Sequence, residues 1–252
     1  MAYVGTLDWA RETGGRLRPS DRLQLVRQAA GFYAGQLSGG LRRCLGLGNA
    51  GAHVDLSAVR VPDSALARAT EAHVAAVSPP WLAAHCARSY LWASLLAERD
   101  GIAHDAELLY VACLLHDLGL TKQHEGTYDA VHCFAVEGAY AARDLATLQR
   151  WDAARRDRLA EAIALHLNVI VEVGRGPEAH LLHDGTAFDA AGIRYNDLDR
   201  ATRHAVLARH PRAGSPGLKD GLVPALKRQC CARPGSRTAL LCLGGFARQV
   251  RK

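Results

Sequence analysis

The sequence predicts an all-α protein, and three observations support this fold class. Turn signals at Pro19-Ser20, Gly39-Gly40 and Ser78-Pro79-Pro80 divide the chain into segments of helical length. Within those segments, apolar residues recur every three or four positions, as they do on one face of an α-helix. The alternation of apolar and polar residues that marks a half-buried strand is scarce. We therefore expect a helical bundle with few or no strands.

The predicted helices are bounded by capping residues, prolines and glycines. They cover residues 21–36, 64–77, 81–98, 105–115, 129–148, 152–167, 177–190, 198–210 and 217–231. Ser64 and Asp105 are expected to cap the second and the fourth of them. Residues 108–115 of the fourth helix are so uniformly apolar that it should be almost entirely buried. The stretch 169–176 has no helical pattern and could include a short extended piece.

The charges divide the chain into two parts. Residues 211–252 hold nine Lys and Arg residues against one acidic residue, whereas residues 1–210 carry 22 basic and 24 acidic groups. We therefore predict a helical body over residues 1–210 and a basic C-terminal extension over residues 211–252 that packs on it. A basic segment can bind nucleic acid, but arginine dominates here in an Ala- and Gly-rich chain, so nucleic acid is not the expected partner.

Composition excludes several classes of protein. With 252 residues, 49% of them apolar and 22% charged, the chain is neither disordered nor a coiled coil. Its longest apolar run, Leu108 to Leu115, is far shorter than the roughly 18 residues of a membrane span. Seven cysteines without a CxxC motif do not form a disulfide framework, so we expect unpaired thiols, with a redox or metal role for Cys230-Cys231 as the alternative. The sequence predicts a cytoplasmic protein with no membrane partner, and its apolar helical surface would allow a homodimer.

Among three His-Asp dipeptides, His116-Asp117 carries the strongest functional signal. His104-Asp105 begins a predicted helix, where a capping role accounts for the aspartate, and His183-Asp184 fits a turn or a polar pair within a helix. His116-Asp117 instead ends the apolar run of the buried helix. A histidine and a carboxylate at such a place are costly unless they are paired or bind a cation.

Polar residues on the neighbouring predicted helices could complete a cation site. His85 lies on the preceding helix, and Asp189 and His166 lie in apolar segments further along the chain. His85, His116, Asp117 and Asp189 would give two imidazole and two carboxylate ligands. Such a set suits Zn²⁺, and equally iron, manganese or nickel.

The order His85, His116-Asp117, Asp189 resembles the HD-domain superfamily of metal-dependent hydrolases. Further blocks are similar to its cyanamide hydratase-like branch, and the similarity extends over residues 62–199. These blocks are Pro62-Asp63-Ser64, Ser78-Pro79-Pro80, Arg88-Ser89-Tyr90, 107–112, 115–121 and 133–139. The resemblance implies an all-α HD-domain bundle with one divalent metal ion, Zn²⁺ by preference, at its centre.

The resemblance to this branch implies the hydration of a small nitrile-like compound, such as cyanamide to urea. A bound metal ion lowers the pKa of its water, and the water then adds to the electrophilic carbon. On this hypothesis Asp117 is catalytic as well as a ligand, and His166 transfers the proton. The candidates for binding the small-molecule substrate are Thr121, Lys122, His132 and Phe134.

Three other functions stay open. A phosphohydrolase acting on a nucleotide or phosphate monoester would need basic residues, and Arg88, Lys122 and Arg194 could supply them, although Leu120 follows Gly119 where many HD phosphohydrolases carry a charged residue. His132 and His166 could instead bind a second ion in a di-iron oxygenase. A non-enzymatic helical module that binds nucleic acid through its basic extension is the third alternative.

Overall fold

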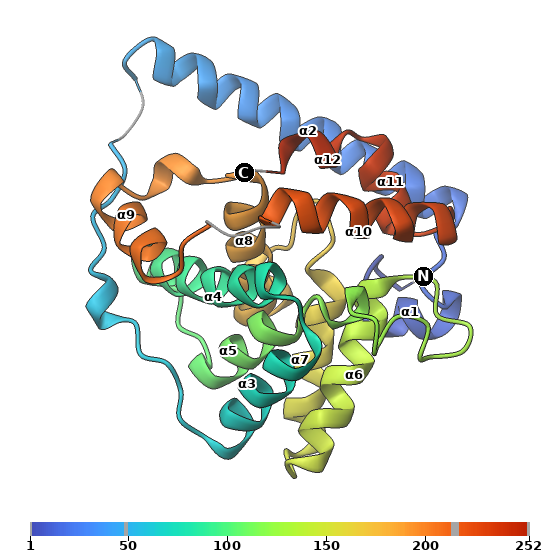
Figure 1. The fold of residues 1–252 in the computed structure, drawn as a ribbon. Coiled ribbons are helices and arrows are strands. Elements are labelled where there is room, and N and C mark those ends of the chain that lie inside the picture. The colour runs from blue at the N-terminus through green and yellow to red at the C-terminus, as the bar shows by residue number, and fades with distance from the viewer. Residues whose placement is uncertain (1, 48–49, 213–216, 251–252) are drawn as a thin grey trace.

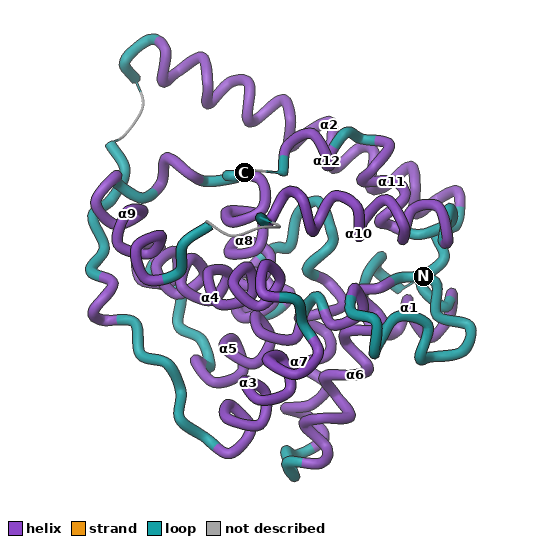
Figure 2. Tube along the Cα trace, viewed as in Figure 1, coloured by secondary structure: helices purple, strands orange, loops and turns teal. Residues whose placement is uncertain are grey.

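The computed structural model describes residues 2–47, 50–212 and 217–250, and its regular elements in these ranges are all helices. The prediction of an all-α fold is confirmed (Figures 1 and 2). The α-helices are α1 (Leu7–Thr13), α2 (Pro19–Cys44), α3 (Ala65–Val77), α4 (Pro80–Asp100), α5 (Ala106–Leu115), α6 (Phe134–Leu148), α7 (Ala153–Leu165), α8 (Pro177–Ala191), α9 (Arg200–Arg209), α10 (Leu218–Ala232), α11 (Arg237–Leu243) and α12 (Phe246–Gln249). Four short 3₁₀ helices, η1 (Leu56–Ala58), η2 (Leu118–Leu120), η3 (Val173–Arg175) and η4 (Tyr195–Asp197), lie in the connections.

Helix α5 is the buried centre of the fold. Every residue from Leu108 to Leu115 is buried, as its apolar sequence predicts. The carboxylate of Asp105 caps the helix by accepting a hydrogen bond from the backbone N–H of Leu108. Helices α3, α4, α7 and α8 pack around α5, so the chain that leaves its C-terminal end enters the interior rather than solvent.

Helices α4 and α8 cross at close range because Gly185 has no side chain. A Cβ atom at this position would lie 2.3 Å from the carbonyl oxygen of Ser89 and 2.9 Å from Cβ of Ala93. The crossing brings the polar residues in the middle of α4 against the C-terminal half of α8. The interior of the bundle thus receives polar side chains from both helices.

Helix α2 is longer than predicted. The expected end before Gly39-Gly40 is wrong, because both glycines lie within the helix, which continues to Cys44. The first positive φ after the helix belongs to Gly46, at 73°, and a left-handed residue of this kind commonly terminates a helix. Much of α2 is exposed, and in Figure 1 it runs along one edge of the molecule beside α11 and α12.

Other boundaries also differ from the prediction. Helix α6 begins at Phe134 rather than near residue 129, and the short helices α1, α11 and α12 were not predicted at all. The irregular stretch 169–176 holds η3 and no strand. None of the described helices is both long and apolar enough to cross a membrane.

The C-terminal helices pack on the remainder of the chain through apolar residues. Leu222 and Leu226 of α10 belong to a buried cluster that also contains Leu25 of α2 and Phe134 of α6. A disulfide joins Cys230 of α10 to Cys242 of α11, so the expectation of unpaired thiols is wrong at these two positions. Packing of α11 against α10 brings the two residues together, and sequence spacing does not reveal it. Cys231, the other member of the vicinal pair, is free and exposed.

Candidate metal centre

The His116-Asp117 pair lies where α5 ends and η2 begins. His116 caps the C-terminus of α5, and both side chains are buried. Gly119 allows η2 to lie directly against the start of α6, because a Cβ there would come within 2.1 Å of the carbonyl oxygen of Phe134. This contact fixes the direction of the chain just after Asp117.

Two imidazoles and one carboxylate meet at this point. Nε2 of His116 lies 3.2 Å from Oδ2 of Asp117, and Nε2 of His85, from α4, lies 3.9 Å from the same oxygen. One ligand atom from each of the three residues lies within 4.8 Å of the others, which is the spacing of groups that could hold one metal ion. His85, His116 and Asp117 thus form a possible metal site.

A third histidine approaches the other oxygen of Asp117. His166 follows the last residue of α7 and is buried, and its Nε2 lies 3.7 Å from Oδ1 of Asp117. The rings of His166 and His116 meet edge to face with centroids 5.0 Å apart. The carboxylate of Asp117 is therefore surrounded by three imidazoles.

The Nδ1 atom of each imidazole has a hydrogen-bond acceptor. Nδ1 of His116 lies 2.8 Å from the carbonyl oxygen of Cys113, and Nδ1 of His166 lies 2.6 Å from that of Ile163. Nδ1 of His85 lies 2.7 Å from Oδ2 of Asp189. Since these acceptors require a proton on Nδ1, the neutral rings direct unprotonated Nε2 atoms toward Asp117. Lone pairs and a carboxylate that converge in a buried space need a cation between them, so the residues present fit a divalent metal ion.

The electrostatics of the cluster point the same way. Burial by itself would raise the pKa of Asp117, but the neighbouring His116, with His166 and His85, holds the pKa of this carboxyl below its usual range. Burial lowers the pKa of His166 to about 3, and the charge of His116 acts in the same direction. Burial disfavours charge on His116 too, yet Asp117 raises the pKa of its imidazole well above the ordinary value. Asp117 thus favours positive charge on the imidazoles around it.

Residues 82–193 match the family model of the HD domain. This segment is an HD domain. It spans α4 to the end of α8 and contains His85, His116, Asp117 and Asp189, the four residues whose order suggested the superfamily. No curated protein sequence matches the chain.

Asp189, predicted as a fourth metal ligand, has hydrogen-bond partners at both carboxylate oxygens, and its ligation of a metal stays a prediction. Its Oδ1 accepts hydrogen bonds from Nε of Arg88 at 2.8 Å, Nε1 of Trp92 at 3.0 Å and Nη2 of Arg212 at 2.8 Å. Its Oδ2 accepts from Nη2 of Arg88 at 3.0 Å and from Nδ1 of His85. With both oxygens engaged, Asp189 lies behind His85 and orients its ring. Carboxylates that hold a metal-binding histidine in this way also make it more basic.

Of the predicted substrate-binding residues, Phe134 alone lies at the centre. Its ring centroid is 6.0 Å from that of His166. Thr121 is buried and donates its hydroxyl hydrogen to the carbonyl oxygen of Leu118 at 2.7 Å. Lys122 is exposed, and the half-buried His132 lies beside Arg16, with 3.5 Å between Nε2 and Nη2. These three residues are not brought to the metal centre.

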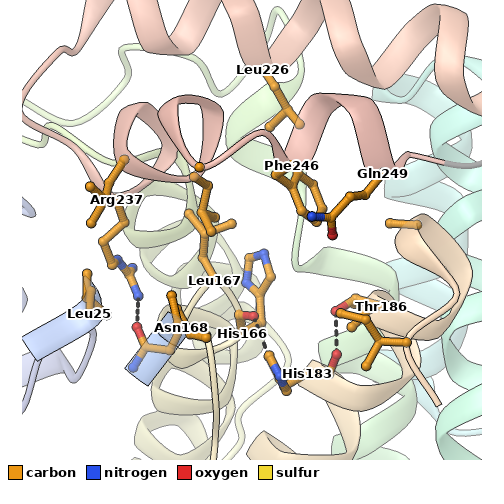
Figure 3. Close-up of a pocket in the computed structure, with 18 of the residues that line it drawn as sticks. Leu25, His166, Leu167, Asn168, His183, Thr186, Leu226, Arg237, Phe246 and Gln249 are labelled. Atoms are coloured by element: carbon orange, nitrogen blue, oxygen red, sulfur yellow. Dashed lines mark hydrogen bonds between the residues drawn. The ribbon is translucent and has the colours of Figure 1, made fainter. Parts of the chain in front are cut away.

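A cavity of about 370 Å³ adjoins the cluster and is lined by His85, His116, Asp117, His166 and Phe134. Its wall includes three polar residues that the sequence analysis did not single out as site residues, His183, Asn168 and Arg237 (Figure 3). His183 makes a hydrogen bond through Nδ1 to the carbonyl oxygen of His166, and Nη1 of Arg237 donates to Oδ1 of Asn168 at 2.8 Å. Arg237 appeared in the sequence only as one charge of the basic extension, and no local pattern marks it as buried.

Proposed function

We propose that this HD-domain protein is a metal-dependent hydrolase or hydratase that acts on a small molecule. The observation that carries the proposal is the convergence of three imidazole Nε2 atoms on the carboxylate of Asp117. His85, His116 and Asp117 would hold a divalent ion there, and the ion would supply a water whose pKa is lowered toward neutral pH. Zn²⁺ is the ion we propose first, since it favours nitrogen and carboxylate ligands in such sets.

His166 is the residue we propose for proton transfer. Its Nδ1–H is held by the carbonyl oxygen of Ile163, so Nε2 is the atom that exchanges protons. Burial lowers the pKa of the imidazole and so keeps the ring neutral near pH 7, with a lone pair on Nε2, while the carboxylate of Asp117 favours the protonated ring. Burial of the cluster limits its contact with bulk water to the cavity that it adjoins.

The specific reaction we propose first is the hydration of a nitrile-like carbon, with cyanamide to urea as its simplest case. Water adds its oxygen to the carbon, and its two hydrogens end on the former nitrile nitrogen as the carbon–nitrogen triple bond becomes a single bond. Phe134 and Leu167 line the cavity and provide apolar surroundings. Such a wall favours a neutral substrate over a phosphate, which requires charged donors.

A single observation favours phosphomonoester hydrolysis as the second candidate. Arg237 lines the cavity, is 1% exposed, and has no carboxylate partner within the described part of the chain. Its Nε is buried and makes no hydrogen bond. The arginines expected to contact a phosphate are engaged elsewhere, Arg88 by Asp189 and Arg194 by three aspartates. A substrate anion would therefore meet Arg237.

Metal analysis and two assays test the proposal. Elemental analysis of the purified protein is compared with that of the double variant His116→Ala, Asp117→Ala and of the control His104→Ala, which alters another His-Asp dipeptide. Each protein is assayed for urea from cyanamide and for phosphate from nucleoside monophosphates and octyl phosphate.

We expect about one equivalent of a divalent metal in the parent and in His104→Ala, and loss of both metal and activity in the double variant. A parent without metal would refute the proposal. Two equivalents of iron would instead support the di-iron alternative. Phosphate release without urea formation would establish the second candidate.

A further inference from the structure

The cavity extends from the buried metal centre toward the surface. His116 and Asp117 at its inner end are almost fully buried, whereas Val26, Tyr33 and Leu243, which also line it, are exposed. Its outer walls come from α2, α8, α10, α11 and α12, and Figure 3 shows Leu226 and Phe246 above His166, with Thr186 of α8 below them. A ligand that reaches the metal centre therefore passes between these helices.

The walls distant from the cluster are mainly hydrocarbon. They consist of leucine, valine, alanine, isoleucine and phenylalanine side chains, among them Leu25, Leu222, Leu226 and Phe246. Two of the polar residues nearby bond to protein groups rather than facing the cavity unsatisfied. Thr186 donates to the carbonyl oxygen of His183, and the amide nitrogen of Gln249 donates to the hydroxyl of Tyr33. Such a surface offers a ligand contact with carbon and few hydrogen bonds.

The cavity is much larger than cyanamide, which has three non-hydrogen atoms. At about 30 Å³ for each water-sized group, 370 Å³ has room for about a dozen such groups. This volume lies within the range of about 300–1,000 Å³ that is typical of sites for drug-sized ligands. An apolar cavity of this size is expected to bind a hydrocarbon group of about ten atoms.

We propose that the cavity between α2 and α10–α12 binds an apolar portion of the substrate. The substrate is then an amphiphile, with its reacting polar group beside His166 and Arg237 and its hydrocarbon group along Leu222, Leu226 and Phe246. The placement of the reacting group rests on the proposed function, whereas the hydrocarbon site does not. Cyanamide would accordingly be a poor surrogate that fills only the inner end.

Calorimetric titration of the protein as purified tests the hydrocarbon site. The ligands are the unreactive alcohols butanol, hexanol, octanol and decanol, and the carboxylates of the same chain lengths. Burial of each added methylene should tighten binding about fourfold, with the same dependence on chain length for both head groups. Carboxylates that bind more tightly than the alcohols at every length would indicate that Arg237 and the metal centre receive an anion.

Two neighbouring positions on α2 provide a matched pair of variants. Ala29 lines the cavity, whereas Ala30 is exposed and is not part of its wall. Ala29→Trp should abolish the gain in affinity from hexanol to decanol, and Ala30→Trp should leave it unchanged. Circular dichroism melting shows whether both variants fold as the parent does.

Affinity that does not increase with chain length in the parent would overturn the proposal, as would unchanged decanol binding by a folded Ala29→Trp. These outcomes are independent of the metal analysis. If the protein binds metal and hydrates cyanamide but its affinity does not depend on chain length, the proposed function stands and the hydrocarbon site is refuted. If the purified protein contains no metal but binds decanol more tightly than hexanol, the hydrocarbon site is supported and the proposed function is refuted.

Discussion

Asp189→Asn should show whether Asp189 orients His85 or binds the metal ion itself. The substitution keeps the shape of the side chain and removes its charge, which leaves the guanidinium of Arg88 buried without a carboxylate. Arg88 is 1% exposed and Asp189 is fully buried, so solvent cannot compensate. Breaking a buried ion pair by removing one partner costs about 3–5 kcal/mol of unfolding free energy. At about 2–4 °C per kcal/mol for a chain of this size, the melting temperature should fall by about 6–20 °C.

The same substitution should weaken metal binding without abolishing it. Loss of the carboxylate that accepts the proton of His85 Nδ1 removes the orientation of one ligand and leaves His85, His116 and Asp117 in place. Changes in groups that orient metal ligands typically cost about 10–100-fold in metal affinity. Asp117→Asn, which alters a ligand, should abolish binding over the same range of concentrations.

Thermal melting and metal titration against a competing chelator measure these two effects. Asp63→Asn is the control for stability, because it breaks the exposed Asp63–Arg68 pair and should change the unfolding free energy by less than about 1 kcal/mol. Loss of metal from Asp189→Asn as complete as from Asp117→Asn would show that Asp189 is a ligand. A melting temperature within about 3 °C of the parent would refute the cost assigned to the buried pair.

Four further substitutions test other parts of the structure. Gly185→Ala should destabilise the fold by about 1–3 kcal/mol, because the added Cβ overpacks against Ser89. Gly31→Ala in α2 should stabilise the fold by about 0.5–1 kcal/mol, because an added Cβ there meets no other atom. Denaturant unfolding measures both changes. Burial lowers the pKa of His183, so below about pH 6.5 the unfolded chain binds a proton at this residue and the folded protein does not. In urea unfolding, the unfolding free energy of the parent should therefore fall more steeply on acidification than that of His183→Gln. Equal slopes for the two proteins would contradict this. Arg237→Gln should lower kcat/KM for octyl phosphate more than for a neutral substrate, and a uniform loss would assign Arg237 a structural role only.

Local sequence patterns were sufficient to predict most helices. The apolar run of α5, the cap at Asp105 and the proline at the first position of α8 are local signals, and the corresponding helices lie within a few residues of their expected bounds. Gly39-Gly40 misled the prediction because two glycines only weaken a helix, whereas the left-handed residue that terminates α2 comes later. Termination depends on which glycine adopts positive φ, and composition does not specify this.

The candidate site shows a sharper limit of sequence reasoning. His116 and Asp117 were identifiable because a buried apolar helix ends in two polar residues. The role of Asp189 was not, since a carboxylate in apolar company fits both a ligand and a group that orients one. Arg88 and Trp92 bear on this choice, because both lie on the face of α4 that meets α8 and both donate to Oδ1 of Asp189. That face is set by the close crossing at Gly185, which is a tertiary feature.

The possible metal ligands and most of the outer cavity wall come from different parts of the chain, which explains why membership of the HD domain alone does not identify the substrate. The possible metal ligands, the group that orients His85 and the proposed proton carrier all lie within residues 82–193. Apart from α8, the outer walls of the cavity come from α2, which precedes this segment, and from α10–α12, which follow it. A site of this construction can keep the chemistry of water activation while helices outside the HD domain change the shape and polarity of what reaches it. Arg237 and the leucines of α10, which lie outside the HD domain and line the cavity, should therefore determine which substrate this protein accepts.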